Sequence, residues 1–286
     1  MNPIDARASE VEMASRLTDR IAGYGKCIVA FSGGVDSSVV AMAAVEAVGK
    51  ENCVAITAES PSVSQFELET AAQVARKIGI RHRLIQTSEL ENRDYVANRG
   101  NRCFFCKSEL YSRIVSLAEF RTGYTLLNGT NADDLGDYRP GLQAASDHNV
   151  VSPLAELGYD KSTVRVLARL WDLPIWNKPA SPCLASRIAH GEPVTPEKLA
   201  MIEKAEGFLR EKGFHEFRVR YHAGHHARIE FHPDELEKAL KSAIRSDINS
   251  RLKTIGFQFV AIDLEGFRSG KLNEALPVHQ ISSHSH

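Results

Sequence analysis

One glycine-rich octapeptide constrains the fold of this chain more than any other feature. Residues 31–38 read FSGGVDSS, directly after the apolar run 27–31 and at the start of a helical stretch, 36–48. Two glycines let the backbone approach a ligand closely, and the N–H groups of a helix start attract an anion. A simple turn with a helix cap is the alternative. The loop is neither a Walker A motif nor G-x-G-x-x-G. We predict a pyrophosphate cradle formed by Ser32, Gly33, Gly34, Ser37 and Ser38.

Short apolar runs and helical stretches alternate around this loop. Such alternation predicts βαβ units on a parallel sheet, a Rossmann-like α/β fold. Ligands of such sheets bind beyond the carboxyl ends of the strands, so we expect the polar loop 128–134 to face the same crevice as the octapeptide. Strands are predicted at 27–31, 53–58, 82–85 and 124–127, and helices at 36–48, 64–78 and 104–119.

A domain boundary is predicted near the turn at 191–198, where Thr195 can cap a helix that Pro196 opens. The 286 residues suit two domains. We predict the phosphate-loop domain at residues 1–191, a small α/β domain for substrate binding and oligomerisation at 192–275, and a disordered tail at 276–286.

Two arginines mark the predicted second domain. Arg218 and Arg220 alternate with apolar residues along a predicted strand, so both guanidiniums share one face and can reach one phosphate. A solvated strand face paired with acids is the alternative. Glu206 and Glu230 are further candidates for contacts with a metal or a substrate.

The five cysteines are too few, and odd in number, for a disulfide framework, which favours a reducing compartment. Cys27 and Cys53 lie in apolar runs and are interpreted as core residues. Cys183 follows two prolines and precedes Arg187 by four residues. A nearby cation lowers a thiol pKa, as a nucleophile or metal ligand requires. A buried structural cysteine is the alternative at this position.

A C-x-x-C motif, Cys103 to Cys106, stands at the start of a predicted helix between Arg102 and Lys107. This spacing puts both sulfurs on one side of a turn, which suits metal binding or redox chemistry. Two cysteines that face the core beside Phe104 are the alternative.

These motifs resemble known families. The octapeptide resembles the signature of the PP-loop ATP pyrophosphatases, and PCLASR at 182–187 resembles the LarE family of sulfur transferases, which build the nickel-pincer nucleotide cofactor. The likeness spans nearly the whole chain, including 128–134, 139–141, 152–154, 218–220 and 227–230. It implies ATP and Mg²⁺ as cofactors, with Asp36 toward Mg²⁺. The further binding residues that it implies are Asn131, Asp133, Arg187, Arg218 and Arg220.

The LarE resemblance also implies a reaction. A carboxylate of pyridinium-3,5-biscarboxylic acid mononucleotide is activated as an acyl-adenylate, Cys183 attacks, AMP leaves, and C–S cleavage yields a thiocarboxylate. Two rounds give the bis-thiocarboxylate. Cys103, Cys106 and Cys183 allow a second sulfur source, a 4Fe-4S cluster whose open iron carries sulfide. We favour this cluster over Zn²⁺, which normally takes four protein ligands in structural sites.

Charge and patterning limit the partners. Lys and Arg (35) balance Asp and Glu (36), so we expect no nucleic-acid partner, and no apolar run is long enough for a membrane span. We predict a cytoplasmic protein. The LarE resemblance implies a small mononucleotide substrate, a homo-oligomeric state, an upstream carboxylase and a downstream nickel-insertion enzyme. An iron–sulfur tRNA thiolase, an ammonia ligase of the NAD or GMP synthetase type, and a nucleotide sensor remain as alternatives.

Overall fold

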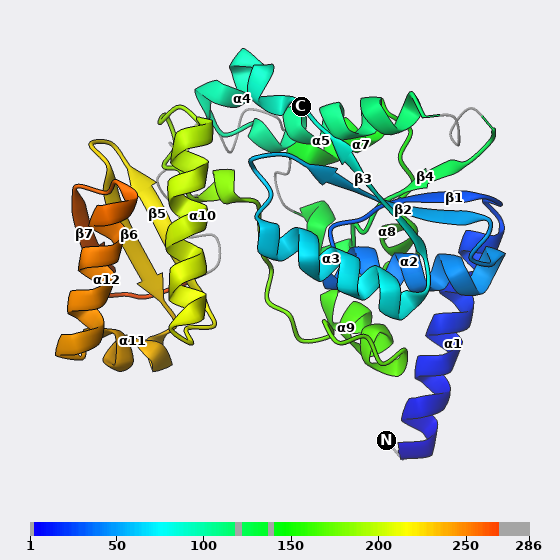
Figure 1. The fold of residues 1–286 in the computed structure, drawn as a ribbon. Helices are drawn as coiled ribbons and strands as arrows, with labels where there is room; N and C mark the ends of the chain where they lie inside the picture. Colours follow the sequence, from blue (N-terminus) through cyan, green and yellow to red (C-terminus); the bar gives the residue numbers. More distant parts are fainter. Residues whose placement is uncertain (1–2, 118–121, 137–139, 269–286) are drawn as a thin grey trace. The chain divides into compact units, whose positions relative to one another are not determined.

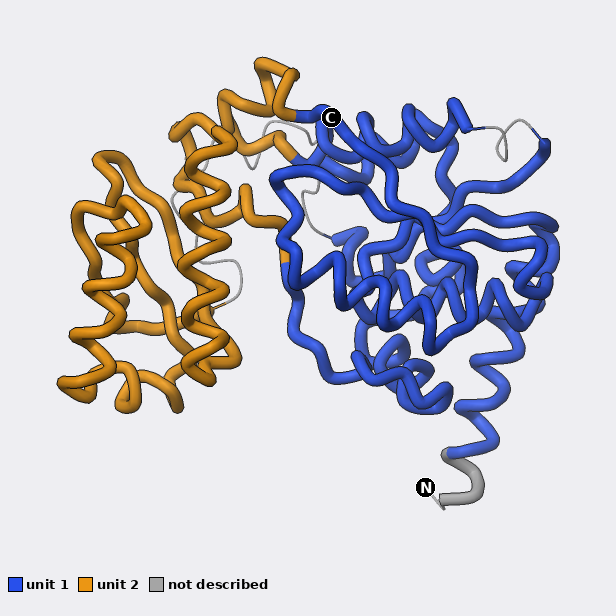
Figure 2. The backbone as a smooth tube through the Cα atoms, viewed as in Figure 1, with its two compact units in different colours: residues 1–89, 103–181 blue, residues 90–102, 182–286 orange. Residues whose placement is uncertain are grey.

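The computed structural model of the protein describes residues 3–117, 122–136 and 140–268. Packing divides the chain into two units, unit 1 (1–89 and 103–181) and unit 2 (90–102 and 182–286) (Figure 2). This division differs from the boundary predicted at residue 191, because the preceding ten residues pack with the second unit. The predicted tail at 276–286 lies outside the described residues.

Unit 1 is built on a four-stranded parallel sheet in the order β3-β2-β1-β4, which confirms the predicted α/β fold. Strand β1 (Cys27–Ala30) pairs with β2 (Cys53–Glu59) and with β4 (Thr125–Leu127), and β3 (Arg81–Gln86) pairs with β2. Since all four strands run in one direction, the loops that follow β1 and β4 leave the same edge of the sheet.

Helices cover both faces of this sheet (Figure 1). The helices described in unit 1 are α1 (Pro3–Ala22), α2 (Val35–Val48), α3 (Gln65–Ile78), α5 (Arg102–Val115), α7 (Pro140–Asp147), α8 (Pro153–Glu156) and α9 (Lys161–Leu170), with the 3-10 turn η2 (Ala132–Gly136). The 3-10 turn η1 (Glu89–Glu91) begins at the last residue of the first segment of unit 1. Successive strand residues point to opposite faces. Val29 accordingly lies in a core with α1, α2, α3 and α9, and Ile28 lies in a core with α5 and α7.

Unit 2 carries a three-stranded sheet in the order β5-β6-β7. Strands β5 (Phe217–His222) and β6 (His226–Phe231) are antiparallel, and β7 (Phe259–Ile262) runs parallel to β6. Thr195 caps the helix that Pro196 begins, as predicted. The helices of this unit are α4 (Arg93–Ala97), α10 (Pro196–Glu211), α11 (Pro233–Leu240) and α12 (Ser242–Ile255), with the 3-10 turn η3 (Leu184–Arg187). Across the described part of the chain, no helix has both the length and the hydropathy needed to cross a bilayer.

Asn98 ties the short segment 90–102 to the rest of unit 2. It ends α4 in the left-handed conformation, with φ 55°, and its side chain is fully buried. Its Nδ2 donates to the carbonyl oxygens of Ile188 (3.5 Å), Ala189 (2.8 Å) and Glu192 (2.9 Å). These bonds explain why the residues just before the predicted boundary pack with unit 2.

Candidate functional site

The loop between β1 and α2 has the geometry of an anion cradle. Gly33 has φ +69°, and a Cβ at this position would lie 2.6 Å from the Cα of Ala71 in α3. Gly34 is the N-cap of α2 and supplies no side-chain cap, so the first N–H groups of the helix keep their capacity for a ligand. The buried Ser38 hydroxyl has no hydrogen-bond partner among the described residues. This loop therefore presents hydrogen-bond donors to an anion, and its two glycines carry no side chain that would block the approach of the anion.

The loop after β4 lies against the start of α2, where the sheet topology predicts it. A Cβ on Gly129 would lie 2.6 Å from the backbone nitrogen of Ser37. Asn131 Nδ2 donates to Asp36 Oδ1 (2.9 Å), and the backbone N–H of Lys161 donates to Asp133 Oδ2 (2.9 Å). The structure thus brings three predicted binding residues, Asp36, Asn131 and Asp133, into one network.

Lys161 is a member of this network that sequence reasoning missed. Its Nζ lies 2.5 Å from Asp36 Oδ2, and it is the first residue of α9. Asp160 caps this helix by accepting from the backbone N–H of Thr163 (2.8 Å). Asp160, as a helix-capping residue, indicates from sequence where α9 begins. No sequence motif connects Lys161 with Asp36, because the two residues are 125 positions apart in the chain.

The residues of this crevice fit a nucleoside triphosphate with Mg²⁺. The hydroxyl oxygens of Ser32 and Ser37 lie 3.1 Å apart beside the open start of α2, which suits phosphate oxygens. Mg²⁺ usually takes one or two carboxylates together with phosphate oxygens and water. Asp36, the acid in the first turn of α2, is placed to supply one, and Mg²⁺ would exchange with the Lys161 ammonium there.

Cys183 is exposed at the N-cap of η3, so it is not the buried structural cysteine of the alternative interpretation. Arg187 is 2% exposed. Its Nη1 donates to the carbonyl oxygens of Pro182 and Cys183, the latter at 3.1 Å, while Nε and Nη2 bind Glu206 at 2.9 and 3.2 Å. Arg187 therefore holds the backbone of the turn that presents Cys183, and the predicted contact with the thiolate or a phosphate stays a prediction.

Arg218 and Arg220 are buried in β5, so this strand face is not solvated, whereas the pairing with acids that the alternative expects is present at Arg220. Arg220 Nη2 lies 2.7 Å from Glu230 Oε2. The Arg218 guanidinium lies over the ring of Phe267, 4.7 Å from its centroid. Burial, followed by the charge of Arg187, lowers the pKa of Arg218 to about 10. Both strand arginines thus lie in a low-dielectric setting where an anion would be held strongly.

Glu206 binds protein groups on several sides. Besides Arg187, it accepts from the backbone N–H of Val219 (3.2 Å) and from Arg210 Nη2 (3.3 Å). Burial alone would raise its pKa, but the charges of Arg187 and Arg218 and the hydrogen bonds from Arg187 and Val219 together outweigh burial, so the pKa is lowered. We call Arg187, Arg218, Arg220, Glu206 and Glu230 the arginine cluster. Its three buried guanidiniums exceed its two carboxylates by one charge, which favours an anionic ligand.

The C-x-x-C motif lies in the first turn of α5, which begins at Arg102, two residues before the predicted start. Cys103 is exposed and Cys106 is half-buried, and both belong to unit 1, whereas Cys183 belongs to unit 2. In the described ranges no group of three or more His, Cys, Asp or Glu side chains is arranged to hold a metal ion. The 4Fe-4S cluster stays a prediction, and no step below depends on it.

The remaining cysteines have a structural role. Cys27 and Cys53 are fully buried and paired in register on neighbouring strands. Burial, followed by the neighbouring Cys53, raises the pKa of Cys27 to about 12. A thiol that stays protonated at neutral pH is a poor nucleophile. These two residues therefore match the predicted core role and supply no sulfur chemistry.

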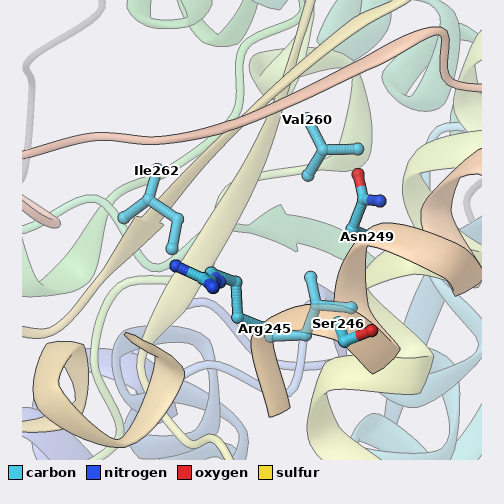
Figure 3. A pocket seen from close by; sticks show the side chains of 6 residues that line it. Arg245, Ser246, Asn249, Val260 and Ile262 are labelled. Atoms are coloured by element: carbon cyan, nitrogen blue, oxygen red, sulfur yellow. The ribbon is translucent and has the colours of Figure 1, made fainter. Parts of the chain in front are cut away.

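A pocket of unit 2 lies between α12 and β7 (Figure 3). Its volume is about 470 Å³, and its lining mixes apolar side chains with one arginine. None of the predicted site residues belongs to this lining. The lining residues are Arg245, Ser246, Ile248, Asn249, Val260 and Ile262.

Comparisons with known proteins agree with the interpretation of residues 31–38 as a phosphate-binding loop, called the phosphate loop from here on. The NAD synthase family matches residues 11–123, which include β1, α2 and the C-x-x-C motif. The NH(3)-dependent NAD(+) synthetase of Chlorobaculum tepidum is 27% identical over 165 residues, covering 56% of this chain and 58% of that protein. Likeness to these synthetases is thus partial.

Two relatives match over nearly their full length. The uncharacterized protein slr1717 of Synechocystis sp. is 46% identical over 252 residues, covering 88% of this chain and 93% of that protein. The pyridinium-3,5-bisthiocarboxylic acid mononucleotide synthase of Lactiplantibacillus plantarum is 34% identical over 255 residues, covering 89% of this chain and 91% of the synthase. The second match includes both units of the chain.

Proposed function

The chain belongs to the LarE family of ATP-dependent sulfur transferases, and from this premise we propose that it inserts sulfur into pyridinium-3,5-biscarboxylic acid mononucleotide, giving the thiocarboxylate precursor of the nickel-pincer cofactor. The strongest support is the match to the mononucleotide synthase over 91% of its length. Of the two units, the first supplies a phosphate cradle and the second an exposed cysteine beside buried arginines.

Activation of the substrate is assigned to unit 1. A substrate carboxylate oxygen attacks the α-phosphorus of ATP, pyrophosphate leaves, and an acyl-adenylate forms. The N–H groups at the start of α2, with the Ser32 and Ser37 hydroxyls, bind the phosphate oxygens. Asp36 would hold Mg²⁺, which neutralises phosphate charge when bound. Lys161, whose Nζ lies 2.5 Å from Asp36 Oδ2, would supply a cation to the same phosphates.

Sulfur transfer is assigned to Cys183. Its thiolate attacks the acyl carbon, the C–O bond to AMP breaks, and a thioester forms. A base then removes the Cα proton of Cys183, and the Cβ–Sγ bond breaks as the Cα–Cβ double bond forms. The substrate leaves with a thiocarboxylate, and dehydroalanine remains in the protein. The exposed position of Cys183 supports this role, since an acyl-adenylate can reach only an accessible thiol.

The substrate phosphate is assigned to the arginine cluster. Arg218 and Arg220 carry buried positive charge, and guanidinium forks match phosphate oxygens in geometry. Arg187 and Glu206 support this site indirectly, because they fix the turn that carries Cys183. A carboxylase that supplies the dicarboxylate, an enzyme that inserts nickel into the dithiocarboxylate, and a homo-oligomeric state complete the proposal.

Intact-protein mass spectrometry after reaction with ATP and the dicarboxylate mononucleotide tests the sulfur source. We expect one product thiocarboxylate per protein chain, with loss of the mass of one H₂S located at residue 183. Reductant does not restore this mass, because elimination, unlike disulfide formation, is not reversed by thiols. Cys183→Ala should abolish product and keep substrate-dependent exchange of pyrophosphate into ATP.

Several outcomes would contradict the proposal. Full thiocarboxylate formation by Cys183→Ala would exclude Cys183 as sulfur donor. Repeated turnover without loss of mass, in protein that carries iron and sulfide, would favour cluster-borne sulfur. Formation of an amide from ammonia in place of a thiocarboxylate would place the chain with the synthetases that share its phosphate loop.

A further inference from the structure

Helix α3 of unit 1 holds the chain segment that leads to Cys183. Glu67, in the first turn of α3, accepts a hydrogen bond from Lys178 Nζ at 2.6 Å and another from Ser181 Oγ at 2.8 Å. The Lys178 and Glu67 side chains are 17% and 18% exposed. An ion pair this well covered is screened less than a surface pair. The two bonds fasten residues 178 and 181 to one carboxylate.

The same face of α3 packs on the phosphate loop. Residues 67 and 71 are four positions apart and lie on one side of a helix. A Cβ on Gly33 would meet the Cα of Ala71 at 2.6 Å, so the loop backbone lies directly against α3 there. Ser64 fixes the start of the helix by accepting from the backbone N–H of Glu67 (3.3 Å). One helix therefore contacts the loop at Gly33 and the segment 178–181 at Glu67.

Chain length makes this attachment matter for Cys183. Two residues of extended chain span about 7 Å at most. Fixing Ser181 therefore limits the distance that the Cys183 backbone can move from it. Pro179 and Pro182 reduce the freedom of the segment further, because proline fixes φ near −65°. A displacement of about 1 Å at a reacting atom can slow a reaction by about a hundredfold.

We propose that Glu67 is a positioning residue for sulfur transfer: by binding Lys178 and Ser181 it holds the segment before Cys183 in register with the phosphate loop, so that the thiol attacks the adenylate. This inference rests on the proposed function of Cys183. Glu67 touches neither substrate nor the reacting sulfur in this role. It acts through two bonds on the segment 178–181, and its loss affects the thiol step rather than adenylate formation.

Separate measurement of the two half-reactions tests this role. In Glu67→Ala we expect single-turnover thiocarboxylate formation to slow by about tenfold or more, since two charge-assisted hydrogen bonds are lost. Pyrophosphate exchange into ATP should stay within about twofold of wild type. In Glu67→Gln, which keeps an acceptor for Ser181 and loses the ion pair, we expect an intermediate rate.

A second readout does not depend on catalysis. The rate of alkylation of Cys183 by iodoacetamide, measured by peptide mass spectrometry with and without ATP, reports how the segment is held. We expect Glu67→Ala to change this rate at Cys183 and to leave Cys103 unchanged. Glu69→Ala is the matched control, because Glu69 lies on the same helix, is exposed, and accepts a hydrogen bond from Gln65 Nε2 (3.2 Å) on that helix.

The results separate this inference from the proposed function. If Cys183→Ala keeps transfer activity, the sulfur assignment is wrong whatever residue 67 does. If Cys183→Ala is inactive and Glu67→Ala matches Glu69→Ala in both readouts, the positioning role is wrong. If Glu67→Ala is poorly folded, Lys178→Met and Ser181→Ala give the same tests. Equal loss of pyrophosphate exchange and sulfur transfer in those variants would also overturn the inference.

Discussion

The phosphate loop of unit 1 and the arginine cluster of unit 2 attract anions by opposite means. The loop relies on backbone N–H groups, small side chains and the start of α2, with close approach at Gly33. The cluster relies on long side chains whose charges are buried and partly balanced by Glu206 and Glu230. The loop residues are neighbours in sequence, whereas the ion pairs of the cluster join residues that are 10 and 19 positions apart.

This difference predicts different responses to mutation. A backbone cradle is sensitive to any added side-chain volume and tolerates loss of a single hydroxyl. A buried ion-pair cluster is less sensitive to a change in side-chain volume, but it loses much stability when one charge loses its partner. Mutations in the loop should therefore change ligand affinity without a matching change in the free energy of unfolding. Mutations in the cluster should change both together.

Glu206→Gln tests the cluster and should have the largest effect. The change leaves Arg187 buried without its carboxylate, which costs about 3–5 kcal/mol of unfolding free energy. Wild type should keep this stability until the pH falls below about 4.5, because the folded-state pKa of Glu206 is lowered and the unfolded chain protonates first. Urea unfolding at several pH values measures both effects. Glu211→Gln, exposed on the same helix, should behave as wild type.

Gly33→Ala tests the loop and should have the next largest effect. A left-handed alanine costs about 1–2 kcal/mol, and the clash with Ala71 adds about 1–3 kcal/mol. Because relief of the clash would displace the loop donors, we expect ATP affinity, measured by calorimetry, to fall by about tenfold or more. Gly25→Ala has the same backbone strain at φ +71° without a clash, and unchanged ATP affinity there would assign the loss to the cradle.

Arg218→Gln separates the two ligands. Loss of a charged donor weakens a bound phosphate by about 1.5–3 kcal/mol, so we expect mononucleotide affinity to fall by about ten- to a hundredfold. ATP affinity, measured in the same calorimeter, should not change, because ATP is assigned to the loop. A parallel loss of ATP affinity would show that the two regions do not have separate ligands.

His82→Asn should have the smallest effect, because His82 supports the loop only indirectly. Its Nε2 lies 2.8 Å from Thr57 Oγ1, which donates to the carbonyl oxygen of Phe31 (2.6 Å). Burial, with the charge of Arg76, lowers the pKa of His82. The unfolded chain therefore binds the proton first, and stability falls as the pH drops below about 6.5. His82→Asn should remove this part of the pH dependence, which urea unfolding between pH 7 and 5 measures.

Sequence patterns predict unit 1 better than unit 2. The strands of the parallel sheet are short apolar runs, and the loop at 31–38 carries its own signature, so local residues determine both. In unit 2, β6 is not predicted from the sequence. Polar residues such as His226 and Arg228, together with the buried residues at its end, interrupt the alternation of apolar and polar residues that identifies a strand. Helix α12 escapes for a similar reason, since its exposed polar residues outnumber Ile248 and Leu252.

The site divides in the same way. Residues with a motif, such as Asp36 and Cys183, are found from sequence, and so is the alternation of Arg218 with apolar neighbours. Their partners are not, because Lys161 and Glu67 have no signature and reach the site through tertiary packing. The burial of Arg218 also depends on packing, since it lies under the ring of Phe267.

The Asn98 clamp has a consequence for the order in which the chain is made. Its three carbonyl partners begin 90 residues further along the chain, at Ile188. At about 5–20 residues per second, a ribosome needs roughly 5 to 20 seconds to synthesise that interval. Residues 90–102 are therefore synthesised before their hydrogen-bond partners exist, at a time when most of the parallel sheet is already available to fold. A fragment that stops at residue 181 would contain residues 90–102 and would lack the carbonyl groups that Asn98 binds.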